Sequence, residues 1–258
     1  MMSLAQGLLG AASGTLVGFT LGLIGGGGSV LAVPLMVYLV GVPNAHIAIG
    51  TSSIAVAVSA AFGLSIHARA GTVKWACAFV LAAAGVIGAL LGSVIGKMVD
   101  GQRLLVLFAL LMLVIAALMR LRRDYAGDHT VQLNKANAPK LAGLGLATGL
   151  LSGFFGIGGG FLIVPALVFA TDMPLVYAVS SSLVAVLAFG LTTAASYAFS
   201  GLIDWPLAGI FIAGGLAGGW IGVRSAHLFA SRRTLLSDIF VGVIICVAIY
   251  MLIRSWSG

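Results

Sequence analysis

Long apolar runs separated by short polar stretches dominate the chain. The first 68 residues contain no Lys, Arg, Asp or Glu, and later uncharged runs cover 75–96, 141–171 and 173–203. A helix needs about 20 apolar residues to cross the hydrocarbon core of a bilayer. The pattern therefore predicts a polytopic membrane protein that is entirely α-helical.

Each half of the chain divides into five apolar segments. These segments are 4–24, 29–41, 47–68, 75–96 and 103–119 in the first half, and 141–157, 160–171, 175–199, 205–223 and 234–253 in the second. The second segment of each half, at about 12 residues or roughly 18 Å of helix, is too short to span alone. It either forms a hairpin with the segment before it or crosses with help from its flanks. We expect about ten segments, of which eight span the membrane and two are short hairpin arms.

Composition supports the same class of protein. Of the 258 residues, 61% are hydrophobic and 7% are charged, and the mean hydropathy is +1.19. A soluble domain carries about 25% charged residues. The first apolar stretch follows no basic region and exceeds the length of a signal peptide, so we expect the membrane domain to begin at Met1. Cys77 and Cys246 lie in separate apolar segments, which favours packing over a disulfide.

Two sequence patterns occur twice. The pattern "GLIGGGGSVLAVP" at 22–34 returns as "GFFGIGGGFLIVP" at 153–165, and "AIGTSS" at 48–53 returns as "AVSSSL" at 178–183. The offset is 131 residues for the first pattern and 130 for the second. Such self-similarity indicates a duplicated architecture. We predict two transmembrane repeats of about 130 residues, joined by a basic linker, with the boundaries 1–119, 120–140 and 141–258.

The thirteen basic residues distinguish two topologies. If the first two segments of each half return the chain to its starting side, ten basic residues share one side and three share the other. If the short segment does not return the chain, the split is eight against five. Cytoplasmic loops carry the excess of Lys and Arg, which favours the first arrangement. In that arrangement the two repeats are inverted relative to each other, and the linker 120–140 is cytoplasmic.

Clustered glycines interrupt the first hairpin of each repeat, ahead of Pro34 and Pro165. Both residue types disfavour helix. Irregular backbone survives at membrane depth only where it is buried in protein or lines a wet cavity. We expect two broken helices near the midplane, each pointing free N–H groups and a positive dipole end at the gap, which favours an anion. The candidate binding glycines are Gly25, Gly26, Gly27, Gly28, Gly156, Gly158, Gly159 and Gly160. The alternative is that they only allow close helix packing.

Hydroxyl side chains are the second group of candidates. They are Ser29, Thr51, Ser52, Ser53, Ser180, Ser181 and Ser182. These groups either donate hydrogen bonds to an oxyanion or bond back to carbonyls of their own helix. A third group, His67, Arg69 and Tyr197, either lines a cytoplasmic vestibule or anchors helix ends at the interface.

Reactive chemistry is sparse. The chain has no Glu, and of its six Asp residues only Asp238 lies as far as one turn inside an apolar segment, so no acidic proton relay is visible. The sequence also lacks an H-E-x-x-H pattern, paired carboxylates and a Cys/His cluster. We therefore expect no catalytic residue, metal or cofactor, and no enzyme. The net charge of +7 is assigned to basic loops, not to nucleic-acid binding.

The duplicated stretches at 22–53 and 153–182 resemble the sulfite/organosulfonate exporter family TauE/SafE, and the resemblance covers essentially the whole chain. It implies transport of small sulfur-containing anions, such as sulfite, sulfoacetate or other organosulfonates, across the cytoplasmic membrane of a prokaryote. The second repeat departs from the first in two places. It has "FGIGGG" for "IGGGGS" and Ser180 for Gly50, so the two half-sites need not contribute equally.

Three transport modes are open at this point. An inside-negative potential drives anions outward, which favours export by alternating access without a coupling ion. Proton- or sodium-coupled uptake and an anion channel are the alternatives, because backbone carbonyls at a helix break can also hold an ion. The expected partners are a small anionic substrate and the lipid bilayer, and the sequence is compatible with a homodimer.

Overall fold

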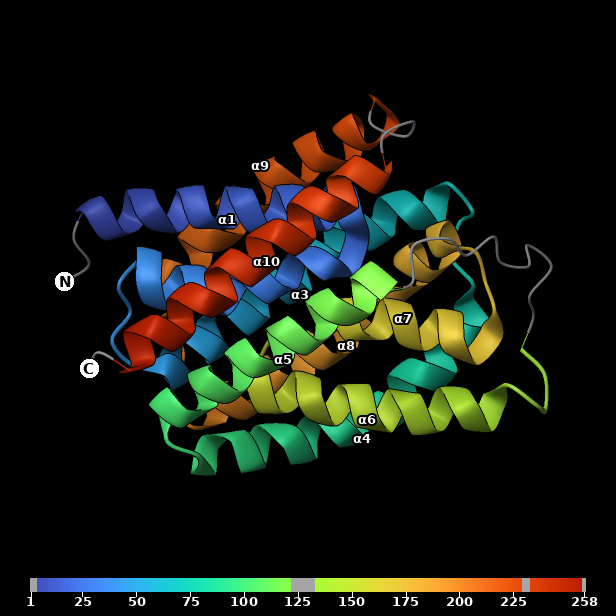
Figure 1. Cartoon of the computed structure of the whole chain (residues 1–258), viewed down its shortest axis with the longest axis horizontal. Coiled ribbons are helices and arrows are strands. Elements are labelled where there is room, and N and C mark those ends of the chain that lie inside the picture. Colours follow the sequence, from blue (N-terminus) through green and yellow to red (C-terminus); the bar gives the residue numbers. More distant parts are fainter. Residues whose placement is uncertain (1–3, 122–132, 229–232, 257–258) are drawn as a thin grey trace.

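The computed structural model describes residues 4–121, 133–228 and 233–256, and within these ranges the regular structure is helical (Figure 1). The all-helical prediction is therefore confirmed for this part of the chain. The first half contains α1 (Leu4–Ile24), η1 (Gly25–Leu31), α2 (Ala32–Pro34), η2 (Leu35–Leu39), α3 (Ala45–Arg69), α4 (Trp75–Met98) and α5 (Gly101–Leu121). The second half contains α6 (Ala138–Phe155), α7 (Gly160–Thr171), α8 (Leu175–Phe199), α9 (Trp205–Leu228) and α10 (Arg233–Trp256).

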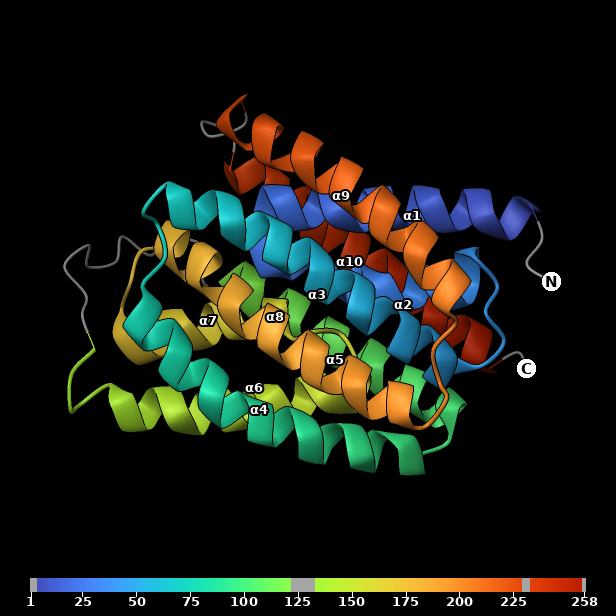
Figure 2. The ribbon, with the colours of Figure 1, turned by 180° about the vertical axis from the view of Figure 1, so that it is seen from behind.

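The helices form one bundle with two broad faces. Figure 1 shows α5 and α10 in front, and Figure 2 shows α3 and α8 on the opposite face. Helices α1 and α9 pair along one edge of the bundle, and α4 and α6 pair along the other. The short arms that follow α1 and α6 lie between the two faces. The two repeats are thus interleaved, since each edge pair takes one helix from each half.

Helix directions follow from the glycine contacts at the two edges. A methyl group built at Gly14, Gly18 or Gly22 would clash with successive backbone carbonyls of α9, so α1 and α9 run in the same direction. Gly145 and Gly149 of α6 meet successive carbonyls of α4 in the same way. Small residues allow helix backbones to approach this closely in membranes. Packing is therefore the role of the glycines along these edges.

The chain reverses at each hairpin. In Figure 1, α1 runs from the N-terminus towards the right and the arm η1–α2–η2 brings the chain back, whereas α6 starts at the right and α7 returns to that side. The two halves therefore begin in opposite directions, as the favoured topology requires. The end that carries residues 133–137 is called the linker end, and the end that carries residues 200–204 is called the opposite end.

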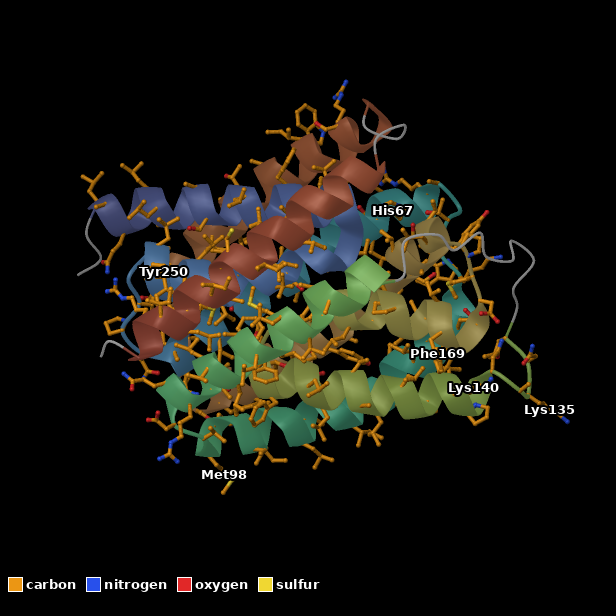
Figure 3. The ribbon with its side chains drawn as sticks, in the orientation of Figure 1. His67, Met98, Lys135, Lys140, Phe169 and Tyr250 are labelled. Atoms are coloured by element: carbon orange, nitrogen blue, oxygen red, sulfur yellow. The ribbon has the colours of Figure 1, made fainter. Side chains whose placement is uncertain are left out.

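Labelled side chains identify the two ends of the bundle. Figure 3 shows His67, Lys135 and Lys140 at the linker end, and Met98 and Tyr250 at the opposite end. Most of the predicted linker, residues 122–132, lies outside the described residues, and so do Arg122, Arg123 and Arg232.

The surface of the bundle is apolar where a membrane would contact it. On α4, the glycines face α6, whereas Ile87, Leu91 and Val94 are 53–58% exposed. Five helices of the described chain are long and apolar enough to cross a bilayer, namely α1, α3, α4, α8 and α9. Four shorter apolar stretches accompany them, and they include the two hairpin arms. The structure is that of a polytopic membrane protein.

The arm of the first repeat is more irregular than the sequence pattern predicts. Instead of one helix over 29–41, the chain forms a 3-10 helix, one α turn and a π-helical turn over Leu35–Leu39. Pro34 has no backbone N–H and cannot continue a regular hydrogen-bond ladder, which accounts for the change of helix type beside it.

Candidate functional site

The break in the second repeat is built from three left-handed glycines. Gly156, Gly158 and Gly159 have φ angles of +67°, +66° and +67°, and α7 begins directly afterwards. An L-residue pays a steric penalty in this conformation, whereas glycine does not. The run therefore breaks the helix as predicted, and the backbone turns sharply enough for α7 to return alongside α6.

One buried hydroxyl faces this turn. Ser152 of α6 is fully buried, and a methyl group built at Gly159 would lie 2.9 Å from Ser152 Oγ. Within the described chain this hydroxyl has no hydrogen-bond partner. Ser152 was not among the candidates from sequence, because its counterpart in the first repeat is Leu21 and the duplicated pattern gave no signal there. It adds a hydroxyl at the N-terminus of α7.

Ser53 connects the second break to the first repeat. Its Oγ donates to the carbonyl of Ile49 at 2.7 Å and to the carbonyl of Gly156 at 2.9 Å. Of the predicted hydroxyls, Ser53 is thus one that the fold brings to a glycine break. Its bond to Gly156 also fixes the break against α3.

The break in the first repeat lies in η1. Its backbone turns back on α1, because a methyl group built at Gly28 would lie 2.5 Å from Thr20 Oγ1. Gly28 and Ser29 are buried. For Gly25, Gly26 and Gly27 the structure describes the backbone helix only, and their burial lies outside what it describes.

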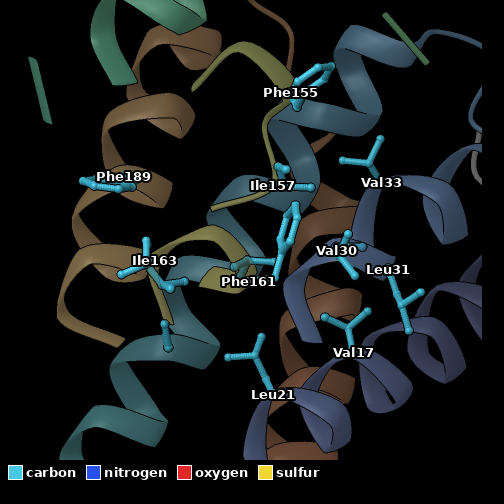
Figure 4. Close-up of a cluster of buried hydrophobic side chains, with 14 of the residues drawn as sticks. Val17, Leu21, Val30, Leu31, Val33, Phe155, Ile157, Phe161, Ile163 and Phe189 are labelled. Atoms are coloured by element: carbon cyan, nitrogen blue, oxygen red, sulfur yellow. The ribbon is translucent and has the colours of Figure 1, made fainter. Parts of the chain in front are cut away.

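The two arms meet inside the bundle, where η1 contacts α7. Figure 4 shows the side chains around this contact, which include Val30, Leu31, Ile157 and Phe161. All four are at most 3% exposed. The contact between the two arms is therefore sealed by apolar packing in this conformation, and a polar solute reaches it only after the helices move.

Thr51 and Ser181 hold the ends of the fold together. Thr51 Oγ1 accepts a hydrogen bond from the backbone N–H of Asp204 at 3.0 Å, and Ser181 Oγ accepts one from the N–H of Lys74 at 2.8 Å. These two bonds are related by the 130-residue offset. Each satisfies a donor just ahead of α9 or α4, so both hydroxyls are used in contacts between the two halves.

The other predicted hydroxyls bond locally. Ser52 Oγ donates to the carbonyl of Ile49 at 3.2 Å, and Ser182 Oγ donates to the carbonyl of Val179 at 2.7 Å. Ser180 Oγ donates to its own helix at Val176 and also lies 3.1 Å from His67 Nδ1. Such back-bonding is common for Ser in membrane helices.

His67 lines a small cavity at the linker end. Its Nδ1 also lies 3.3 Å from Thr72 Oγ1, so the ring is held by two hydroxyls. The cavity has a volume of about 10 Å³, roughly room for one water molecule, and its lining includes Ser59, Phe62 and Leu183. Arg69 is exposed two residues further along the same end of α3. His67 and Arg69 thus lie where a vestibule at this end would open.

Tyr197 does not share that vestibule, and the prediction that groups it with His67 and Arg69 is wrong in this respect. Tyr197 packs on Gly50, where a methyl group would lie 2.9 Å from Tyr197 Cβ. Gly50 and His67 are 17 residues apart on α3, which is about 25 Å along a helix. His67 and Tyr197 are related by the 130-residue offset, and the structure places them at opposite ends.

No group of three or more metal-ligating side chains occurs among the described residues. Cys77 and Cys246 are free thiols, one buried and one exposed. Asp100 and Asp204, at the opposite end, cap helices. Asp100 Oδ1 accepts a hydrogen bond from the N–H of Gln102, and Asp204 Oδ1 accepts one from the N–H of Leu207. The polar groups at the glycine breaks are hydroxyls and backbone amides, which suit a small solute that accepts hydrogen bonds.

A polytopic helical bundle with two broken hairpins meeting in its interior is the architecture of a membrane transporter, in which substrate sites lie at discontinuous helices. Comparison with known proteins identifies the family. The chain belongs to the family described as Sulfite exporter TauE/SafE, whose profile matches residues 10–251. It is a multi-pass membrane transporter, and not an enzyme.

The relatives carry names of the same kind. A probable membrane transporter protein of Xylella fastidiosa (strain 9a5c) is 51% identical over 249 residues, which cover 95% of both chains. The probable membrane transporter protein YdhB of Bacillus subtilis (strain 168) is 26% identical, over 83% of this chain and 87% of the relative. The archaeal protein MJ0441 of Methanocaldococcus jannaschii, also named a probable membrane transporter protein, is 28% identical over 60% of each chain. No solved structure matches the chain.

Proposed function

We propose that this protein exports small sulfur-containing oxyanions, such as sulfite, sulfoacetate or another organosulfonate, across the cytoplasmic membrane by alternating access. The observation that carries the proposal is the second glycine break. There the N-terminus of α7, which spans 12 residues, faces the buried hydroxyl of Ser152, which has no hydrogen-bond partner among the described residues. Backbone N–H groups and the positive dipole end of a helix favour an anion, and a serine hydroxyl adds a donor. The family description supports sulfite as the type of anion.

The proposed site joins the two breaks. From the second repeat it takes Gly156, Gly158, Gly159 and Gly160, together with Ser152, and from the first it takes Gly25, Gly26, Gly27, Gly28 and Ser29. Ser53 lies beside it. The hydroxyls of Thr51, Ser52, Ser180, Ser181 and Ser182 already have hydrogen-bond partners, so we assign them to positioning the helices around the site.

Alternating access fits the closed interior. The second break and the contact between the two arms are buried among apolar side chains, so the transporter must open towards one end at a time to admit and release a solute. The 1–119 and 141–258 units would each supply one broken hairpin as inverted repeats, with the site where the two hairpins meet. The opposite directions of α1 and α6 support this relationship.

The direction of transport and the orientation of the protein in the membrane are inferred from charge. We place the linker end, with the residues 120–140, in the cytoplasm because the basic residues are concentrated there. An inside-negative potential of 100 mV contributes about 2.3 kcal/mol per charge to the outward movement of an anion. Export therefore needs no coupling ion, and the described acids at the opposite end are used as helix caps instead of a proton relay.

The test is sulfite flux in proteoliposomes made with the purified chain. We expect flux that saturates with sulfite concentration and is stimulated by sulfite on the far side of the membrane, without a proton or sodium gradient. Flux that does not saturate would indicate a channel, and flux that requires a gradient would indicate coupled uptake. The absence of flux for sulfite, sulfoacetate and taurine would refute the proposal.

A further inference from the structure

A cluster of polar side chains lies at the opposite end of the bundle, about one helical turn along α3 from Ile49, which contacts Gly156 of the second break. It contains Tyr197 near the end of α8, Lys97 near the end of α4 and His46 near the start of α3. The Lys97 ammonium lies 5.6 Å from the centre of the Tyr197 ring, and the rings of His46 and Tyr197 lie 6.3 Å apart. We call these three residues the opposite-end cluster.

Two members of this cluster carry polar atoms that the described chain leaves unsatisfied. The Tyr197 side chain is fully buried, and neither its hydroxyl nor the buried Nδ1 of His46 has a hydrogen-bond partner within that part of the chain. Burying a polar group without a partner is destabilising, so such groups call for a functional explanation. Both groups are able to donate a hydrogen bond, His46 in the appropriate tautomer.

The third member supplies positive charge. Lys97 Nζ donates to the carbonyl of Ser196 at 3.0 Å and to Ser200 Oγ at 2.9 Å, and both of these partners are neutral. The nearby carboxylates of Asp100 and Asp204 cap helices, each accepting from backbone N–H groups. Lys97 therefore brings a positive charge beside the buried phenol, and the cluster as a whole attracts an anion.

The side chains of the cluster and the neighbouring Ser200 become more buried from the surface towards the interior. Ser200 is exposed, Lys97 is partly exposed and Tyr197 is buried against Gly50 of α3. At the linker end, the equivalent position is His67, which packs against Ser180 and lines a cavity. The repeat thus places His67 at the linker end and Tyr197 at the equivalent position of the opposite end. Tyr197 fills the space at the opposite end, whereas a small cavity remains beside His67.

From these observations we infer that the opposite-end cluster is a second binding station for the transported oxyanion, on the release side, with Tyr197 as its gate. This inference rests on the proposed function. When the bundle opens at this end, the Tyr197 hydroxyl, His46 and Lys97 bind the oxyanion after it leaves the glycine breaks. The cluster holds the anion only briefly, because Lys97 and Ser200 are open to the surface.

The experiment compares sulfite binding and sulfite flux in the purified full chain carrying Tyr197→Phe or Lys97→Met. Binding is measured as the rise in melting temperature with sulfite concentration in detergent, and flux is measured in proteoliposomes. Loss of one charge-assisted hydrogen bond weakens binding by about tenfold. We therefore expect each variant to need about tenfold more sulfite for half-maximal flux and half-maximal stabilisation. Tyr250→Phe, which removes an exposed phenol at the same end, is the matched control and should behave as the wild type.

The outcomes separate the two hypotheses. If the wild type transports sulfite and both variants keep its concentration dependence, the binding station is refuted and the proposed function stands. If the wild type shows no flux but sulfite stabilises it and the variants abolish that effect, the station stands and the proposed function fails. If sulfite neither stabilises nor crosses, both are refuted. A variant with a lower melting temperature but unchanged sulfite dependence would assign Tyr197 a packing role only, and would also refute the station.

Discussion

Thr51 Oγ1 accepts a hydrogen bond from the backbone N–H of Asp204 at 3.0 Å, across 153 residues of sequence. The equivalent bond, from the Lys74 N–H to Ser181 Oγ, closes the other end of the molecule at 2.8 Å. Each bond ties the middle helix of one half to the loop ahead of a helix in the other half. Together they fasten α3 to the start of α9, and α8 to the start of α4.

We expect Thr51→Val to destabilise the protein. Valine keeps the shape of threonine but leaves the Asp204 N–H without its acceptor, which costs about 1–3 kcal/mol of unfolding free energy. The measurement is denaturant unfolding of the detergent-purified protein. Thr192→Val is the matched control, because Thr192 Oγ1 bonds to the carbonyl of Ala188 in its own helix. Equal unfolding free energies for Thr51→Val and the control would show that the hydrogen bond between Thr51 and Asp204 does not stabilise the fold.

Gly159→Leu should abolish sulfite flux while the protein still inserts in the membrane. A side chain at this position has an unfavourable φ of +67° and overlaps Ser152, so it distorts the start of α7. Flux in proteoliposomes and the amount of protein in the membrane fraction are the two measurements. Gly143→Leu, on the same hairpin, has open space around the added side chain and should keep its flux. Retained flux in Gly159→Leu would discard the second break as part of the site.

Ser152→Ala should lower transport without lowering stability. The buried hydroxyl of Ser152 has no partner within the described chain, so its removal leaves no other group unsatisfied. If the hydroxyl donates to the substrate, the sulfite concentration for half-maximal flux rises by about tenfold. Melting temperature and flux are measured together, with Ser65→Ala as the control, because Ser65 Oγ bonds to the Phe62 carbonyl on an exposed helix face. Unchanged flux in Ser152→Ala would remove this residue from the site.

Cysteine labelling in whole cells tests the topology. In a background with Cys77→Ala and Cys246→Ser, Lys135→Cys should react with a membrane-impermeant maleimide only after permeabilisation, because the linker end is placed in the cytoplasm. Met98→Cys, which is 81% exposed at the opposite end, should react in intact cells. Reaction of both in intact cells would place the two ends on the same side and refute the inverted arrangement.

The class of protein and the positions of the helix breaks could be predicted from sequence because both are local. Apolar runs of spanning length require a bilayer, and clustered glycines disfavour α-helix, so α1 ends at Ile24 and α6 ends at Phe155, directly before them. The irregular course of Leu35–Leu39 was missed, since the period of apolar residues does not report a change from α to π hydrogen bonding.

The duplicated pattern by itself established two similar halves, and the asymmetry of basic residues established a preference for inverting them. Only the tertiary structure decided which hydroxyls are used as ties and that His67 and Tyr197 occupy opposite ends. The physical reason is that hydrogen bonding and close packing between residues more than a hundred positions apart depend on how α1 meets α9 and α4 meets α6. Those contacts arise between the two halves, and the sequence of either half does not contain them.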